Sequence, residues 1–311
     1  MHLMIPFASA LSEGGRTALR ELRLPKLQAL LALLTPGEPD VGDELSLSPP
    51  HERALASVLG LAAGADGSLP LAPVFAQRDG IDLGPGAWGR VSPSHWRVGT
   101  EQVSLVDPED LALDETSSRT LLEAVRELFE SEGFVLRYGA PTAWYARHPS
   151  FEGLPCASLD RVIGRNVDLW LAPDPRARLI RRMQSEVQML LYTHPINDER
   201  EARGALAVNS FWLSACGVAD GVRWPEGLVL DESLRRPALG EDWFAWGKGW
   251  HALDAGPVAD LLARAQRSEQ LTLTLCGERA ATTWRLAPRS LVQRVGAAMR
   301  RPDLPALLEA L

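Results

Sequence analysis

Short apolar segments alternate along this chain with segments of helical periodicity, and this alternation limits its fold more than any other feature. Apolar runs at His2–Phe7, Phe134–Tyr138 and Leu271–Cys276 have the length of buried strands. Apolar residues recur at helical spacing between such runs, most clearly over Asp174–Tyr192, which is the strongest predicted helix. Alternating strands and helices favour an α/β fold in which helices cover a sheet.

The same patterns predict further elements along the chain. Strands are expected at Leu71–Gln77, Val103–Val106, Ala143–Arg147, Val167–Leu171, Leu228–Leu230 and Thr282–Leu286. Helices are expected at Thr17–Leu34 (with a break or first turn at Pro25), His51–Ala62, 114–132 (capped by Asp114 or Thr116), Ala255–Gln266, Ser290–Arg300 and Leu304–Leu311. A Trp-rich segment at Asp242–His251 is expected to be a loop.

Charge argues against a nucleic-acid partner. The chain has 40 acidic against 32 basic residues, a formal net charge of -8. Four arginines do gather at the start of one predicted helix: Arg176, Arg178, Arg181 and Arg182. Because acidic residues outweigh them elsewhere, we interpret this cluster as a solvated face.

Apolar runs and cysteines indicate the compartment. No apolar run approaches the roughly 18 residues of a membrane span, and Met1–Phe7 lacks the basic region of a signal peptide. The three cysteines, Cys156, Cys216 and Cys276, are far apart and odd in number, which argues against a disulfide framework or a structural zinc site. We therefore expect a cytoplasmic protein with no membrane partner.

Standard catalytic motifs do not occur in the sequence. It contains no P-loop, no G-x-G-x-x-G, no G-x-S-x-G and no H-E-x-x-H. Cys216 could act as a nucleophile only with a base beside it, and a buried, inert thiol is the favoured interpretation.

One segment, 192–212, concentrates polar side chains of the kind that bind anions. It carries His194, Asn197, Arg200, Arg203 and Asn209 and leads into an apolar strand. Guanidinium forks with amides and an imidazole can form a cradle for a phosphate or carboxylate. The same groups can instead satisfy the backbone of a hydrogen-bonded hinge, and the residues alone favour this second interpretation.

Three stretches of the chain resemble the RpfE family, bacterial proteins named for a gene cluster that regulates pathogenicity factors. They are Met1–Ala8, Cys156–Arg165 and Gln188–Asp198, of which the last is the most specific.

A more distant resemblance is to archaeal-type, cofactor-independent phosphoglycerate mutases of the alkaline phosphatase superfamily. It rests on His194-Pro195-Ile196-Asn197, followed by Arg200, Gly204, Asn209 and Trp212. This resemblance implies an alkaline-phosphatase-like sheet flanked by helices and carrying a smaller inserted α/β subdomain. The expected core is 1–100 plus 190–311, and the expected insertion is 101–189.

The metal ligands of those mutases are missing from the sequence. The family has an Asp at the end of its first strand, a Ser or Thr nucleophile, and later Asp–His pairs that hold two metal ions. Here the first strand ends in Pro6-Phe7, no Asp precedes Asp40, and no His follows an Asp directly or four residues later. The resemblance therefore implies a fold without catalytic metals, and we expect no metal site and no cofactor.

The sequence therefore predicts a non-catalytic regulatory protein that binds a phosphorylated or carboxylated metabolite or a protein partner. The expected binding residues are Arg90, His95, Arg165, His194, Asn197, Arg200, Arg203 and Asn209.

Two alternatives stay open. One is a metal-independent phosphotransferase or hydrolase that uses His194 or His95 as acid–base or phospho-acceptor group. The other is an interaction module that presents the tryptophans of Trp243–Trp250 as a binding surface.

Overall fold

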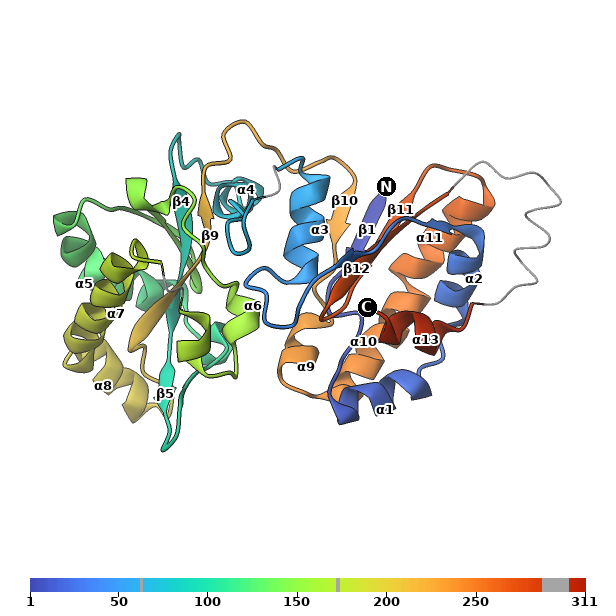
Figure 1. Ribbon diagram of the computed structural model, residues 1–311. Coiled ribbons are helices and arrows are strands. Elements are labelled where there is room, and N and C mark those ends of the chain that lie inside the picture. Colours follow the sequence, from blue (N-terminus) through green and yellow to red (C-terminus); the bar gives the residue numbers. More distant parts are fainter. Residues whose placement is uncertain (62–63, 172–173, 287–301) are drawn as a thin grey trace. The chain divides into compact units, whose positions relative to one another are not determined.

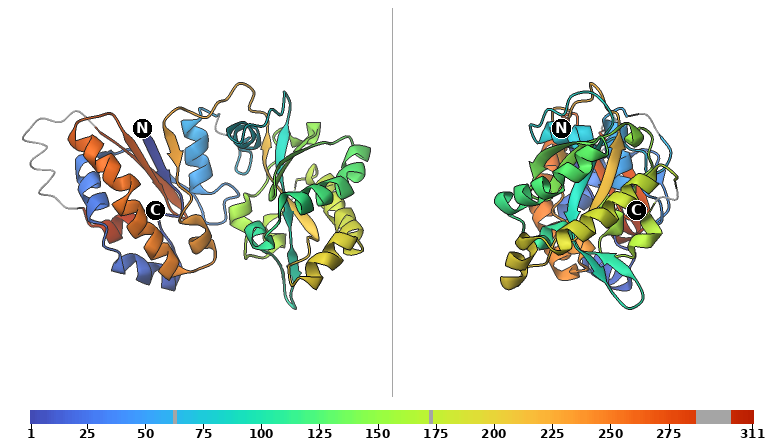
Figure 2. Two further views of the ribbon diagram at one scale, coloured as in Figure 1. Left: turned by 180° about the vertical axis from the view of Figure 1, so that it is seen from behind. Right: turned by 90° about the vertical axis from the view of Figure 1, so that its left-hand side faces the viewer.

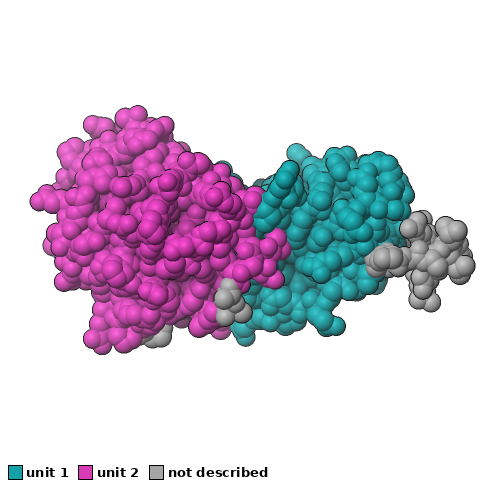
Figure 3. Space-filling model, turned by 90° about the horizontal axis from the view of Figure 1, so that it is seen from above, with its two compact units in different colours: residues 1–44, 49–55, 225–311 teal, residues 45–48, 56–224 magenta. Residues whose placement is uncertain are grey.

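A computed structural model describes residues 1–61, 64–171, 174–286 and 302–311. The chain divides into two compact units, each with its own core (Figure 3). Unit 1 comprises Met1–Glu44, Pro49–Leu55 and Pro225–Leu311, and unit 2 comprises Leu45–Ser48 and Ala56–Trp224.

The unit boundaries differ from those expected from the sequence. Residues 56–100 and 190–224 lie in unit 2 together with 101–189. The reason is one pair of strands: β4 (Trp88–Ser94) pairs with β9 (Ser210–Gly217) in antiparallel fashion. Segments on both sides of the expected insertion thus belong to a single sheet.

Unit 1 is built on a six-stranded mixed sheet with the order β10-β1-β11-β12-β2, in which β3 also pairs with β12. The strand β1 runs parallel to β10 and to β11, whereas β12 is antiparallel to its neighbours. The strands are β1 (His2–Ile5), β2 (Thr35–Pro36), β3 (Asp40–Val41), β10 (Leu228–Leu230), β11 (Thr272–Cys276) and β12 (Ala280–Arg285).

Helices pack on the unit 1 sheet, with α1, α2, α10, α11 and α13 on one face (Figure 1). Leu3 and Ile5 of β1 point into this core, as do Trp246 and Trp250 of α10. The bounds are α1 (Glu13–Glu21), α2 (Pro25–Leu33), α3 (Pro50–Val58, shared between the units), α9 (Arg235–Leu239), α10 (Trp243–Ala255), α11 (Pro257–Gln266) and α13 (Leu304–Glu309).

Unit 2 contains a four-stranded antiparallel sheet with the order β7-β8-β4-β9 and a separate two-stranded pair of β5 with β6. The helices α5, α7 and α8 cover one face of the larger sheet (Figure 2). The remaining strands and helices are β5 (Trp96–Val98), β6 (Val103–Leu105), β7 (Val135–Ala140), β8 (Ala143–Arg147), α4 (Ala72–Arg78), α5 (Glu115–Ser131), α6 (Leu159–Val162), α7 (Ala177–Tyr192), α8 (Pro195–Ala202) and three 3-10 turns, η1 (Pro108–Leu111), η2 (Pro149–Phe151) and η3 (Val167–Trp170).

Alternation along the strands separates the two faces of the unit 2 sheet. Val91 of β4 and Leu213 of β9 face the apolar core. Buried serines occupy the neighbouring positions of the same two strands: Ser92, Ser94, Ser210 and Ser214. One face of this sheet is therefore apolar and the other is polar although buried.

The predicted α/β class is confirmed, as are most of the predicted strands and helices. Pro25 begins α2, and the Asp114 side chain caps α5 by accepting a hydrogen bond from the Ser117 N–H. The helix expected at Ser290–Arg300 lies outside the described residues.

Three predicted elements are wrong. The expected strand at Leu71–Gln77 is the helix α4, and the expected strand at Val167–Leu171 is the 3-10 turn η3, because the apolar runs are too short to reveal their period. The expected Trp-rich loop is the helix α10. The Asp242 side chain caps its N-terminus by accepting a hydrogen bond from the Ala245 N–H.

No helix in the described part of the chain is both long and apolar enough to cross a lipid bilayer.

Candidate functional site

Asn197, the central residue of the mutase-like motif, is tied to the backbone around it. It lies in the first turn of α8 and is 5% exposed. Its Nδ2 donates to the carbonyl oxygens of Leu191 (2.9 Å) and Val208 (2.8 Å), and its Oδ1 accepts from the Val208 N–H (2.9 Å). All hydrogen-bonding positions of the amide but one are thus occupied by backbone groups.

Arg200 is buried in the same way, one turn further along α8. It is 2% exposed, its Nε donates to the Leu206 carbonyl (2.9 Å), and its Nη2 donates to the Leu111 carbonyl. Burial lowers the pKa of this guanidinium, and the positive charge of Arg203 lowers it further. The guanidinium therefore joins α8 to η1 and to the loop before β9.

Asn209 and the two histidines also bond to nearby backbone. Asn209 pairs with Trp96, accepting from its N–H (2.7 Å) and donating to its carbonyl (3.0 Å). His95 Nδ1 lies 2.8 Å from the Ala207 carbonyl oxygen. His194 is the N-cap of α8, and its Nδ1 accepts from the Ile196 N–H (3.3 Å). The segment 192–212 thus has the contacts of a hydrogen-bonded hinge.

The remaining predicted binding residues lie in different surroundings. Arg90 is partly buried on the polar face of the unit 2 sheet, opposite Tyr145 of β8, whose pKa burial raises to about 12. Arg165 is exposed and lies over the Trp170 ring, and Arg203 is exposed and donates to a backbone carbonyl of its own helix. The ligand-binding role of the eight residues stays a prediction.

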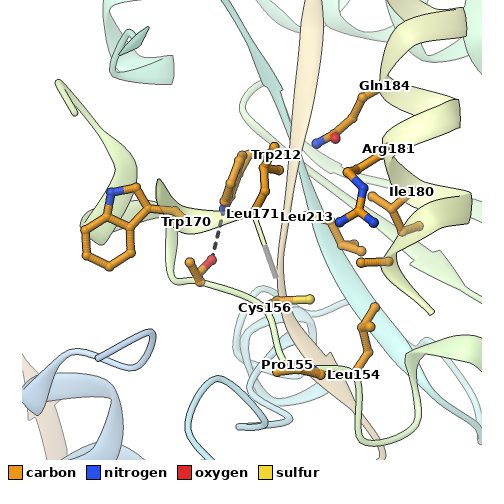
Figure 4. A pocket seen from close by; sticks show the side chains of 12 residues that line it. Leu154, Pro155, Cys156, Trp170, Leu171, Ile180, Arg181, Gln184, Trp212 and Leu213 are labelled. Atoms are coloured by element: carbon orange, nitrogen blue, oxygen red, sulfur yellow. Dashed lines mark hydrogen bonds between the residues drawn. The ribbon is translucent and has the colours of Figure 1, made fainter. Parts of the chain in front are cut away.

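A pocket in unit 2 brings together a different set of residues, and none of those eight lines it. It lies between the loop after η2, the end of η3, the first half of α7 and the strand β9 (Figure 4). Its lining residues are Leu154, Pro155, Cys156, Ala157, Trp170, Leu171, Ala177, Ile180, Arg181, Gln184, Trp212 and Leu213. Its empty space of about 370 Å³ includes the opening to solvent, so the part that the lining residues enclose is smaller.

The guanidinium and the carboxamide of the pocket come from α7. Arg181 and Gln184 are three residues apart, so both extend from one side of the helix toward β9 (Figure 4). Gln184 Nε2 donates to the Phe211 carbonyl (3.1 Å), and Trp212 Nε1 donates to the Ala157 carbonyl (2.9 Å). These hydrogen bonds fix two walls of the pocket.

The sequence did not identify this pocket. The cluster with Arg176, Arg178 and Arg182 predicts Arg181 on a solvated helix face, whereas Arg181 is partly buried and lines the pocket. The helical period of the sequence could have indicated the position of Arg181. Arg181 lies next to the side of the helix that Ala177, Ile180 and Gln184 bury.

The edge of the unit 1 sheet that follows β1 carries none of the acidic metal ligands that the resemblance to the mutases would require. After β1 the chain turns through Pro6 and Phe7, and no acidic side chain follows there. Glu278, after β11, accepts from the Leu11 N–H (2.7 Å), and Asp231, after β10, accepts from the Ser233 N–H (3.0 Å). Within the described residues, no three His, Cys, Asp or Glu side chains gather in a way that could hold a metal ion.

Comparison with known proteins gives structural similarity alone. No family model and no curated protein matches the sequence. The structure is similar to the cofactor-independent phosphoglycerate mutase from Thermoplasma acidophilum, with 15% identity, a TM-score of 0.38, and coverage of 100% of this chain and 98% of that chain. It is also similar to the PH0037 protein from Pyrococcus horikoshii, with 12% identity, a TM-score of 0.48, and coverage of 96% and 91%.

At these values the likenesses establish neither a family nor an activity. The resemblances to the RpfE family and to the mutases, drawn from sequence motifs, stay predictions.

Proposed function

We propose that this protein is a non-catalytic regulatory protein that binds a small carboxylated or phosphorylated molecule in the pocket of unit 2. The composition of the pocket carries the proposal. Its 12 lining residues supply one guanidinium, one carboxamide and one thiol on otherwise apolar walls, and no imidazole or carboxylate. General acid–base catalysis commonly uses the imidazole or carboxylate groups that this lining lacks, whereas binding needs only complementary charge and shape.

Arg181 is the group that would select an anion. A guanidinium has five N–H donors, so Arg181 can bind an anionic group while keeping the intramolecular contact that it already makes. The apolar side chains of the lining, among them Leu154, Leu213 and Trp212, offer surface for the body of the ligand. We therefore expect a ligand with a compact apolar or aromatic body and one negative group.

The third possibility, an interaction surface built from Trp243–Trp250, has only part of its aromatic surface accessible. Trp246 and Trp250 are fully buried in the core of unit 1, where they pack edge to face with ring centroids 6.2 Å apart. These two rings cannot serve as contact residues for a partner, and the aromatic side chains that the segment still offers are partly buried Trp243 and exposed Phe244.

Binding of model anions tests the proposal. We would titrate the purified full chain with benzoate and phenyl phosphate by calorimetry, with neutral benzamide as the uncharged comparison. Arg181→Gln should weaken binding of both anions by about tenfold or more, because a charge-assisted hydrogen bond contributes about 1.5–3 kcal/mol.

Arg178→Gln is the matched control, because Arg178 is exposed on the same helix. It should leave the affinity unchanged. The proposal is wrong if neither anion binds, if benzamide binds as tightly as benzoate, or if the two substitutions have equal effects.

A further inference from the structure

Two cysteines that are distant in the sequence are in contact in unit 2. Cys156 lies in the loop after η2, where its N–H donates to the Gly67 carbonyl (2.9 Å), and Cys216 lies near the end of β9. Their Sγ atoms are 3.5 Å apart. The distance between the two cysteines along the sequence, which argues against a disulfide framework, therefore does not prevent contact in the folded chain.

A bulge in the unit 2 sheet places Cys216 at this contact. Ala215 has a left-handed backbone (φ 57°), and the register of β4 with β9 shifts between Trp88 and Arg90. The extra residue brings Cys216 to the apolar face that Leu213 also occupies. Gly89 of β4 leaves room for the thiol, since a Cβ there would lie 2.7 Å from Cys216 Sγ.

The two thiols differ in accessibility. Cys156 is half-buried and lines the pocket, whereas Cys216 is fully buried. Burial raises the pKa of Cys216 well above its usual value, so this thiol stays protonated at neutral pH. A reagent in solution would therefore meet Cys156 first.

We propose that Cys156 and Cys216 are a redox-active pair that closes to a reversible disulfide by exchange with a low-molecular-weight disulfide entering the pocket. The Cys156 thiolate attacks one sulfur of the reagent, and the first reagent thiolate leaves and takes up the proton that Cys156 had lost. Cys216 Sγ then attacks the Cys156 sulfur, and its proton passes to the second departing thiolate. Two protein thiols are oxidised, and one reagent disulfide is reduced to two thiols.

This inference goes beyond the binding role and does not depend on it. A bond between the two sulfurs would join the pocket wall at Cys156 to the strand β9. Cys276 cannot take part in unit 2, because it is fully buried in the core of unit 1, on β11.

Peptide mapping of the full chain tests the pair. The reduced protein is incubated with glutathione disulfide and, separately, with the smaller 2-hydroxyethyl disulfide; free thiols are then alkylated and the protein is digested with trypsin without reductant. We expect the peptide His148–Arg161 joined to Gly204–Arg223, with the mass of both peptides less two hydrogen atoms. Titratable thiols should fall from three to one and be restored by dithiothreitol.

Two variants separate the steps. Cys276→Ser should form the same link, and Cys216→Ala should keep the reagent bound to Cys156 because no second thiol expels it. A stable mixed disulfide at Cys156 in the wild type, a link to Cys276, a link between two chains, or no reaction with either reagent would each overturn the proposal. The wild-type map decides the question even if Cys216→Ala does not fold.

Discussion

Replacing Asn197 by alanine separates a structural role for the mutase-like motif from a binding role. The substitution removes an amide that makes three hydrogen bonds to backbone groups and is 5% exposed. It leaves the helix α8 with a better helix former, so local propensity does not oppose the change. Any loss of stability must then come from the backbone groups that lose their partner.

The size of the loss follows from counting those groups. The Leu191 carbonyl keeps a second donor, the His194 N–H (3.2 Å), and is little affected. The N–H and the carbonyl of Val208, a residue that is 1% exposed, lose the hydrogen bonds to Asn197. An unsatisfied buried polar group costs about 1–3 kcal/mol, so with two such groups we expect Asn197→Ala to lower the free energy of unfolding by about 2–6 kcal/mol.

Urea unfolding followed by circular dichroism measures the overall effect, and hydrogen exchange followed by mass spectrometry locates it. Amides of unit 2 that exchange through unfolding should exchange at least about 30 times faster, because 1.4 kcal/mol corresponds to a factor of ten. Glu201→Ala is the control, since Glu201 is exposed on the same helix and should change stability by less than about 0.5 kcal/mol.

The reasoning is refuted if the two variants unfold at the same urea concentration with the same exchange rates in unit 2. It is also refuted if Asn197→Ala keeps full stability and instead loses affinity for an anion. In that case the amide would be part of a binding site, as the sequence motif first suggested.

Arg200 of α8, Arg203 at the C-cap of that helix, and His2 of unit 1 give further predictions. Arg200→Met should lower the free energy of unfolding by about 2–4 kcal/mol because two backbone carbonyls lose a buried donor, whereas exposed Arg203→Met should stay within about 0.5 kcal/mol in the same urea assay. Burial, more than nearby positive charge, lowers the pKa of His2 from its ordinary value of 6.5 to about 4. The unfolded chain therefore binds more protons between these values, so stability should fall as the pH drops from about 6.5 to about 4. The pH dependence in this window should flatten in His2→Gln, and an unchanged slope would contradict this assignment.

Elements that are defined by their own residues could be predicted from the sequence. Pro25 marks the start of α2, Asp114 caps α5, and the period of Asp174–Tyr192 gives α7 nearly in full. The absence of an Asp directly after the first strand is also visible in the sequence alone. In each case the deciding interaction is local, because caps, turns and periodicity act within a few residues.

Only the tertiary structure decided which of these elements share a sheet and which side chains meet. The pairing of β4 with β9 moves the unit boundary, and the bulge at Ala215 brings Cys216 to Cys156. Arg181 lines a pocket because β9 and the loop after η2 lie against its helix. Such contacts join distant segments through backbone pairing and burial, and a sequence pattern shows that a face is buried without showing which segment covers it.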